Sequence, residues 1–189
     1  MKKLFFIPVL LLFILTACEK NETDFLDDEK TPAASTSLSR SFYYPEEDLT
    51  LAQTYVQHIN PLFKFDENDN LVLDFDVPYT YGHDDVTLII NKNNLKEGYS
   101  GTYNITSSPA SDVAAYYLYR ITGSSSNRFL PGNSTGSLKI LAYDSRFKTF
   151  TGNYNFTINS INDPVSSAIN NFKETTISIS GSFENIKLK

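Results

Sequence analysis

The sequence predicts an all-β protein: an antiparallel β-sandwich of about eight strands, with barrel-like closure as the alternative. In residues 150–158, Phe, Tyr, Ile and Gly alternate with Thr and Asn. This period of two is typical of a strand with one buried face and one solvated face. Residues 177–183 repeat the pattern with Ser on the polar face. Turn-rich segments such as 66–70 and 91–94 separate stretches rich in β-branched and aromatic residues, which strands favour.

The strand candidates share this composition and follow one another along the chain at 49–59, 71–77, 86–91, 103–106, 113–121, 137–143, 150–158 and 177–188. The alternation changes register in the last of them, where Ile186 and Leu188 fall on the face opposite to the earlier apolar residues. A β-bulge near Glu184 or Asn185 would explain this change. Only residues 163–172 could hold a short helix, and a loop fits them equally well.

Three glycines, Gly101, Gly152 and Gly181, each precede an aromatic residue by two positions. The two members of each pair share one face of a strand. Glycine in a strand commonly marks close backbone approach, so we expect aromatic rings to cover these positions.

The first seventeen residues have the layout of a secretory signal peptide. Lys2 and Lys3 precede an uncharged apolar run at residues 4–15, and Leu-Thr-Ala then leads to Cys18, the only cysteine. The run is shorter than the roughly 20 residues of a membrane-spanning helix. Its end resembles the lipobox of bacterial lipoproteins, which implies cleavage before Cys18 and lipid on that residue. An ordinary signal peptide followed by a chance cysteine is the alternative.

Residues 18–41 are predicted to be the lipidated cysteine and a flexible acidic tether, because residues 19–41 hold six acids and show no periodicity. Residues 42–189 are then a single sandwich domain. Cleavage removes two lysines and no acid, which leaves 14 basic and 22 acidic residues, a net charge of −8. Such a chain repels phosphates, so we expect no nucleic-acid partner and a membrane contact through lipid alone.

The acids after Cys18 resemble the surface-export signals of some Bacteroidetes lipoproteins. Glu19 follows the cysteine, rather than the aspartate that retains enteric lipoproteins in the inner membrane. The resemblance to export signals implies the cell surface, and Glu19 in place of the retention aspartate favours the outer membrane; we leave both faces of that membrane open.

The segments GYSGTYNIT, GSLKILAYD, FTGNYNFTI and ISISGSFENIKL together resemble a group of uncharacterised β-rich Bacteroidetes lipoproteins. The likeness covers roughly residues 98–189. It implies a fold and transfers no functional residue.

No metal or catalytic motif is present in the sequence. His58 and His83 have neither metal-ligand nor triad spacing, and we expect His58 on the polar face of its strand. Asp66 begins a pattern like a calcium loop, but Leu71 and Val77 replace the glycine and the glutamate that such a loop needs. We therefore expect a polar hairpin turn there, no metal and no cofactor.

Residues 78–85 form the one predicted loop with functional character. Tyr79 and Tyr81 could stack on sugar rings, and Asp84 with Asp85 could suggest a glycosidase, which needs two carboxylates across a cleft. The alternative is a loop whose tyrosines cap the edge of the core.

Three classes of function remain. The first is a non-catalytic binding or adhesion module, or an accessory to nutrient capture, with a glycan or protein ligand. The second is a structural envelope protein facing the periplasm, and the third is a glycan-active enzyme. We expect no enzymatic activity, because no nucleophile–base pair is evident. An exposed row of aromatic residues would favour binding, and a featureless Thr/Ser/Asn surface would favour the structural role.

Overall fold

A computed structural model describes residues 30–79, 82–121, 127–129, 133–163 and 173–189. Residues 31–189 form one compact unit. The signal peptide, Cys18, most of the predicted tether and residues 164–172 of the helix candidate lie outside the described residues. No helix in the described part of the chain is long and apolar enough to cross a membrane.

The described chain folds into eleven strands in two antiparallel sheets, which confirms the predicted sandwich and not a single closed sheet. The six-stranded sheet has the order β2-β1-β11-β10-β9-β6. Its strands are β1 (Ser35–Tyr44), β2 (Leu49–Tyr55), β6 (Gly101–Ile105), β9 (Ser134–Asp144), β10 (Thr149–Asn162) and β11 (Glu174–Lys187).

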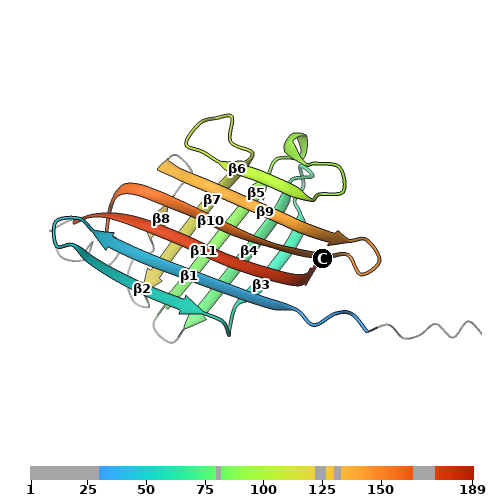
Figure 1. Ribbon diagram of the computed structural model, residues 1–189, viewed down its shortest axis with the longest axis horizontal. Helices are drawn as coiled ribbons and strands as arrows, with labels where there is room; N and C mark the ends of the chain where they lie inside the picture. Colours follow the sequence, from blue (N-terminus) through green and yellow to red (C-terminus); the bar gives the residue numbers. More distant parts are fainter. Residues whose placement is uncertain (1–29, 80–81, 122–126, 130–132, 164–172) are drawn as a thin grey trace, which may run out of the picture. The chain divides into compact units, whose positions relative to one another are not determined.

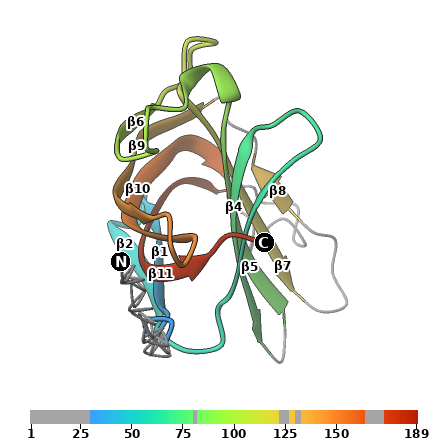
Figure 2. The same cartoon turned by 90° about the vertical axis from the view of Figure 1, so that its right-hand side faces the viewer.

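The five-stranded sheet has the order β3-β4-β5-β7-β8. Its strands are β3 (Asn60–Phe65), β4 (Leu71–Tyr79), β5 (Gly82–Ile90), β7 (Val113–Ile121) and β8 (Asn127–Phe129), and a 3-10 turn, η1 (Lys92–Asn94), follows β5. Figure 1 shows the strands of the two sheets crossing at a steep angle, and Figure 2 shows the sheets as two facing layers.

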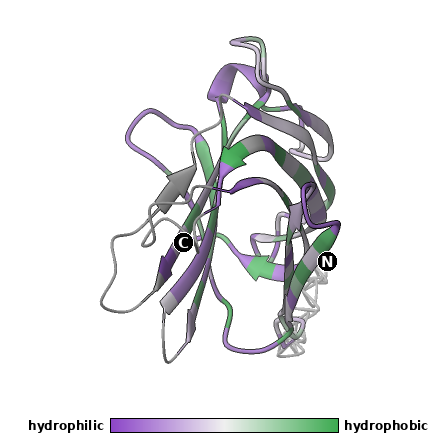
Figure 3. Cartoon of the chain, turned by 90° about the vertical axis from the view of Figure 1, so that its left-hand side faces the viewer, coloured by the Kyte–Doolittle hydropathy of each residue, from purple (hydrophilic) through white to green (hydrophobic). Residues whose placement is uncertain are grey.

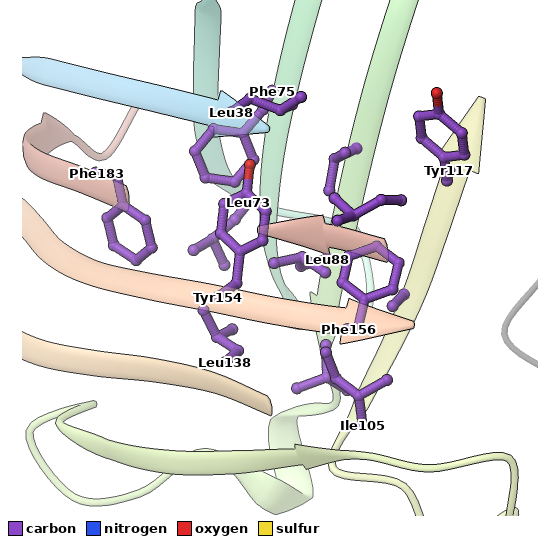
Figure 4. Close-up of a cluster of buried hydrophobic side chains, with 14 of the residues drawn as sticks. Leu38, Leu73, Phe75, Leu88, Ile105, Tyr117, Leu138, Tyr154, Phe156 and Phe183 are labelled. Atoms are coloured by element: carbon purple, nitrogen blue, oxygen red, sulfur yellow. The ribbon is translucent and has the colours of Figure 1, made fainter. Parts of the chain in front are cut away.

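The core lies between the inner faces of the two sheets. Figure 4 shows Leu73 and Leu88 of the five-stranded sheet beside Leu38 and Tyr154 of the six-stranded one, and all four side chains are buried. Green and purple residues alternate along several strands in Figure 3, as expected for strands with one apolar face. The apolar residues of the period-two pattern in the sequence therefore form the core of the sandwich.

The strand count exceeds the predicted eight because β1, β3 and β8 were not predicted, and the candidate at 49–59 holds β2 followed by a bend. The chain bends after β2, and His58 in the bend has a φ of 61°. This positive φ carries the chain from the six-stranded to the five-stranded sheet. The expectation that His58 lies on the polar face of a strand is therefore wrong, and its side chain is exposed in the bend.

Strand β1 starts at Ser35, so the prediction that residues 18–41 form the tether is wrong for its last seven residues. Leu38 and Phe42 point inward and are buried. Arg40 stands between them at an inward position, which interrupts the apolar alternation and hides the strand in the sequence.

The predicted bulge in the last strand is confirmed. Phe150 pairs with Ile186, but Gly152 pairs with Phe183, so β11 holds one extra residue there. Asn185 lies in the bulge and has a φ of 54°. The bulge returns Ile186 to the core side, where it is buried.

The expectation that aromatic rings cover the three glycines is confirmed for Gly152 and Gly181 and wrong for Gly101, where the nearest side chain is that of Lys96. Gly152 lies opposite Phe183, and Gly181 lies opposite Tyr154. A Cβ atom on Gly181 would stand 2.4 Å from the Tyr154 ring. The two rings therefore pack over backbone that only glycine leaves uncovered.

Candidate functional site

The outer face of the six-stranded sheet carries mostly small polar side chains; larger side chains there include Tyr43, Lys139 and Glu184. The small polar side chains occupy the positions that alternate with the core residues along each strand, as the period of two requires. The register aligns six of them in one row across all six strands, namely Thr54, Ser39, Ser180, Asn155, Ser137 and Asn104. With strands about 4.8 Å apart, this row is about 24 Å long.

A second row runs beside the first. It contains Ala52, Ser41, Ser178, Thr157 and Thr135, again directly opposite one another on neighbouring strands. The two rows enclose an open cavity of about 350 Å³ over β2, β1, β11 and β10. We call this cavity the polar groove; its polar outer-face lining is Ser39, Ser41, Thr54, Asn155, Thr157, Ser178 and Ser180.

Most polar side chains of the groove are unpaired. Ser39 and Thr54 share a hydrogen bond of 2.9 Å between their hydroxyl oxygens. The other lining side chains that can donate or accept make no side-chain hydrogen bond with the described chain; they are Ser41, Asn155, Thr157, Ser178 and Ser180. Each hydroxyl offers one donor and two acceptor sites, and the amide offers both kinds. The groove can therefore form several hydrogen bonds with a ligand that carries hydroxyl groups.

The groove is electrically neutral on the solvent side. Arg40 is its only charged lining residue, and its guanidinium turns inward, where Nε donates to Asp84 Oδ2 at 3.3 Å. Only 12% of the Arg40 side chain is exposed. The chain as a whole has a net charge of −6, so this surface is the neutral part of an acidic protein.

Asp84 is the centre of a buried polar network between the sheets. Its carboxylate is fully buried and accepts hydrogen bonds from the hydroxyls of Tyr55, at 2.6 Å, and Tyr117. With Arg40 these donors satisfy the carboxylate, so the network is suited to holding the sheets together. Burial and the adjacent Asp84 raise the pKa of the Tyr55 and Tyr117 hydroxyls, which therefore stay protonated as donors.

The predicted loop at residues 78–85 is a hairpin, so that prediction is wrong. Tyr79 ends β4 and pairs with Gly82 at the start of β5, and Tyr81 lies outside the described residues. Neighbouring residues of a strand point to opposite faces, so Asp84 faces the core and Asp85 the outer surface. The structure therefore does not bring these two carboxylates together across a cleft. The ring of Tyr79 stacks on that of Tyr55 at 6.4 Å, at the edge of the core.

Acidic residues gather on the outer face of the five-stranded sheet. Asp85 lies opposite Asp76, and Thr87 donates to Asp74 at 2.8 Å. His83 Nδ1 lies 3.0 Å from Asp76 Oδ1. Burial together with Asp74 and Asp76 raises the pKa of Asp85 to about 7. Within the described ranges, no group of three or more His, Cys, Asp or Glu residues could hold a metal ion.

The calcium-like segment forms the expected polar hairpin turn between β3 and β4. Asp66 Oδ1 accepts from the backbone N–H groups of Asn68 and Asn70, both at 2.9 Å. Hydrogen bonds from the Asn70 side chain and backbone lower the pKa of Asp66. The Asp66 carboxylate therefore stabilises its own turn.

No protein-family model, curated protein or solved structure matches the chain. We therefore infer function from the residues of the chain itself. Among them, the polar groove brings together five polar side chains that make no side-chain hydrogen bond with the described chain. The alternating Ser and Thr residues that line the groove are visible in the sequence. The strand register that aligns them into rows is visible only in the folded structure.

Proposed function

We propose that the chain is a lipoprotein anchored in the outer membrane through lipid on Cys18, and that its domain is a non-catalytic binding module for a neutral glycan. The observation that carries this proposal is the polar groove with its five unpaired polar side chains. The anchor is inferred from the N-terminal sequence, where Lys2, Lys3, an apolar run and Leu-Thr-Ala precede Cys18.

The chemistry of the groove suits sugar hydroxyl groups, which both donate and accept hydrogen bonds. Ser, Thr and Asn side chains can do the same without a fixed charge. Ligand sites typically enclose about 300–1,000 Å³, and the groove of about 350 Å³ lies at the lower end of this range. The row from Thr54 to Asn104 would let an extended glycan continue beyond the groove.

Electrostatics favours a neutral glycan over a charged one. The net charge of the chain is negative, which disfavours anionic polysaccharides at long range. No acidic side chain lines the groove, so a cationic sugar would have no carboxylate partner there. A neutral polysaccharide is not repelled by the negative charge of the chain and needs no carboxylate partner in the groove.

A structural envelope lipoprotein facing the periplasm is the second candidate. It is favoured by the scarcity of exposed aromatic rings, since Tyr43 is the only aromatic among the large exposed hydrophobic residues of the described chain. Aromatic rings are the usual platform for sugar rings. Under this reading the Ser/Thr/Asn face is a solvated surface.

Affinity electrophoresis of the mature chain in gels containing neutral polysaccharides separates the two candidates. We expect at least one polysaccharide to retard the protein and Ser180→Tyr to abolish the retardation, because a tyrosine there would fill the groove. The matched control is Thr102→Tyr on β6, an exposed outer-face position outside the groove. It should migrate like the wild type. Loss of retardation in both variants, or retardation by no neutral polysaccharide, would contradict the proposal.

A further inference from the structure

Strand β2 is an unprotected edge of the six-stranded sheet. Its seven residues, LTLAQTY, contain no charge and no proline. Proteins normally protect such edges with lysine, proline, bulges or very short strands, because the free backbone groups can pair with another strand. The outer edge of β2 carries none of these features.

The other three edges of the described sheets differ from β2. Edge strand β3 contains Pro61 and Lys64. Edge strand β8 has three residues and β6 has five. The long uncharged edge at β2 is therefore particular to one side of the sandwich.

Apolar side chains are also exposed at this edge. Leu49 and Leu51 lie on the inner face of β2, yet they are 41% and 45% exposed. Val56, just beyond the strand, is 69% exposed. Isolated exposed apolar residues are ordinary, but here they accompany a row of open backbone hydrogen-bonding groups.

We propose that two copies of the chain pair through antiparallel β2 strands, joining their six-stranded sheets across a two-fold axis at Ala52. Only the register centred on Ala52 pairs all seven residues of the strand. In this register Ala52 faces Ala52 of the second copy, and Thr50 faces Thr54. On the inner face, Leu49 meets Tyr55 and Leu51 meets Gln53.

The absence of charge on β2 favours a second copy as the occupant. Two copies of an acidic chain repel each other wherever their carboxylates approach. The paired β2 strands bring no charged side chain together, so this edge avoids like charges directly opposite one another. The Thr–Thr pairs add favourable cross-strand contacts on the outer face.

Pairing would also connect the two polar grooves. The groove row of Ala52, Ser41, Ser178 and Thr157 ends at β2 in each copy. Across the axis the row continues through Ala52 into the same row of the second copy. The pairing does not depend on what the groove binds, so failure of one proposal leaves the other open to its own test.

Disulfide crosslinking tests the register directly. Facing residues of antiparallel strands have Cα atoms about 4.5–5.5 Å apart, within disulfide range. We therefore expect Ala52→Cys in the full mature chain to form a covalent dimer on mild oxidation. Thr54→Cys is the matched control, because its two copies would be about 13 Å apart along the strands. Wild type, which retains Cys18, measures any background.

Mixed samples give a second readout. Thr50→Cys and Thr54→Cys chains should crosslink when mixed and remain monomeric when oxidised separately. In addition, Ala52→Asp should weaken association by about tenfold in sedimentation experiments, because it places two carboxylates opposite each other. Absence of an Ala52→Cys dimer, or equal dimer yields from Ala52→Cys and Thr54→Cys, would overturn the proposal.

Discussion

Arg40 of the six-stranded sheet donates through Nε to Asp84 of the five-stranded sheet at 3.3 Å. The guanidinium also lies over the ring of Phe42, 4.5 Å from its centroid. This contact joins the first strand of the domain to the centre of the opposite sheet. It also turns the only charged residue of the polar groove toward the core, so the groove stays neutral.

Asp84→Ala should destabilise the fold by about 3–5 kcal/mol, because it leaves Arg40 buried without its counter-ion. The hydroxyls of Tyr55 and Tyr117 would lose their acceptor as well. Urea unfolding measures the change. The neighbouring substitution Asp85→Ala, on the opposite face of the same strand, is the control, and an equal loss of stability in both variants would contradict this role of Asp84.

Stability should fall as the pH rises from about 4 to about 7 in proportion to the titration of Asp85. Its pKa is raised from 3.8 to about 7 in the folded chain. The folded state therefore binds more protons than the unfolded state within this window, which makes the slope of stability against pH negative. The titratable and charged groups around Asp85 on this face are Asp76 directly opposite it and Asp74 on β4, His83 on its own strand, and Arg120, which lies opposite His83 on β7.

Asp85→Asn should remove this component of the pH dependence. At pH 8 the variant should be more stable than the wild type by about 1 kcal/mol, since it relieves repulsion between facing carboxylates. At pH 4 the two proteins should have similar stability. Urea unfolding across this range measures the difference, and a variant less stable than wild type at pH 8 would contradict the assignment.

Tyr154→Phe should leave the fold as stable as wild type or stabilise it by about 1–2 kcal/mol, because its buried hydroxyl makes no hydrogen bond in the described structure. The ring itself is needed in the core, where it packs 4.9 Å from that of Phe75. Thermal unfolding of the variant checks this expectation. A clear loss of stability would show that the hydroxyl has a partner.

Gly181→Ala should destabilise the fold by about 1–3 kcal/mol, the usual cost of overpacking a core. The new Cβ would lie 2.4 Å from both the Tyr154 ring and the backbone oxygen of Ser37. Gly152→Ala should behave similarly, because its Cβ would meet Phe183 at 2.5 Å. Wild-type stability in both variants would contradict the close approach of rings and backbone.

Much of the fold can be predicted from the sequence, because alternation of apolar and polar residues reports directly on which face of a strand is buried. Strand β7 matches its predicted bounds, and the bulge at Asn185 appears as a change in that alternation. Strand β1 and the strand position of Asp84 are not predictable in this way. Arg40 and Asp84 stand at inward positions, and each charge is tolerated only because the other sheet supplies its partner.

The polar groove was only partly predictable, for a different reason. The Ser and Thr positions of each strand are visible in the sequence. Their alignment into rows depends on two strand pairings. Strands β1 and β11 pair although they are far apart in the chain, and β10 and β11 pair across a long connection. Local patterns carry no information about such pairings.

The most direct test of the central claim is an NMR titration of the isotopically labelled mature chain with oligosaccharides of the polysaccharide that retards it. We expect chemical-shift changes concentrated at Ser39, Ser180, Asn155 and Thr157, with the outer face of β4 and β5 unaffected. Shift changes centred on Asp74, Asp76 and Asp85, or none at saturating ligand, would contradict the assignment of the groove as the binding site.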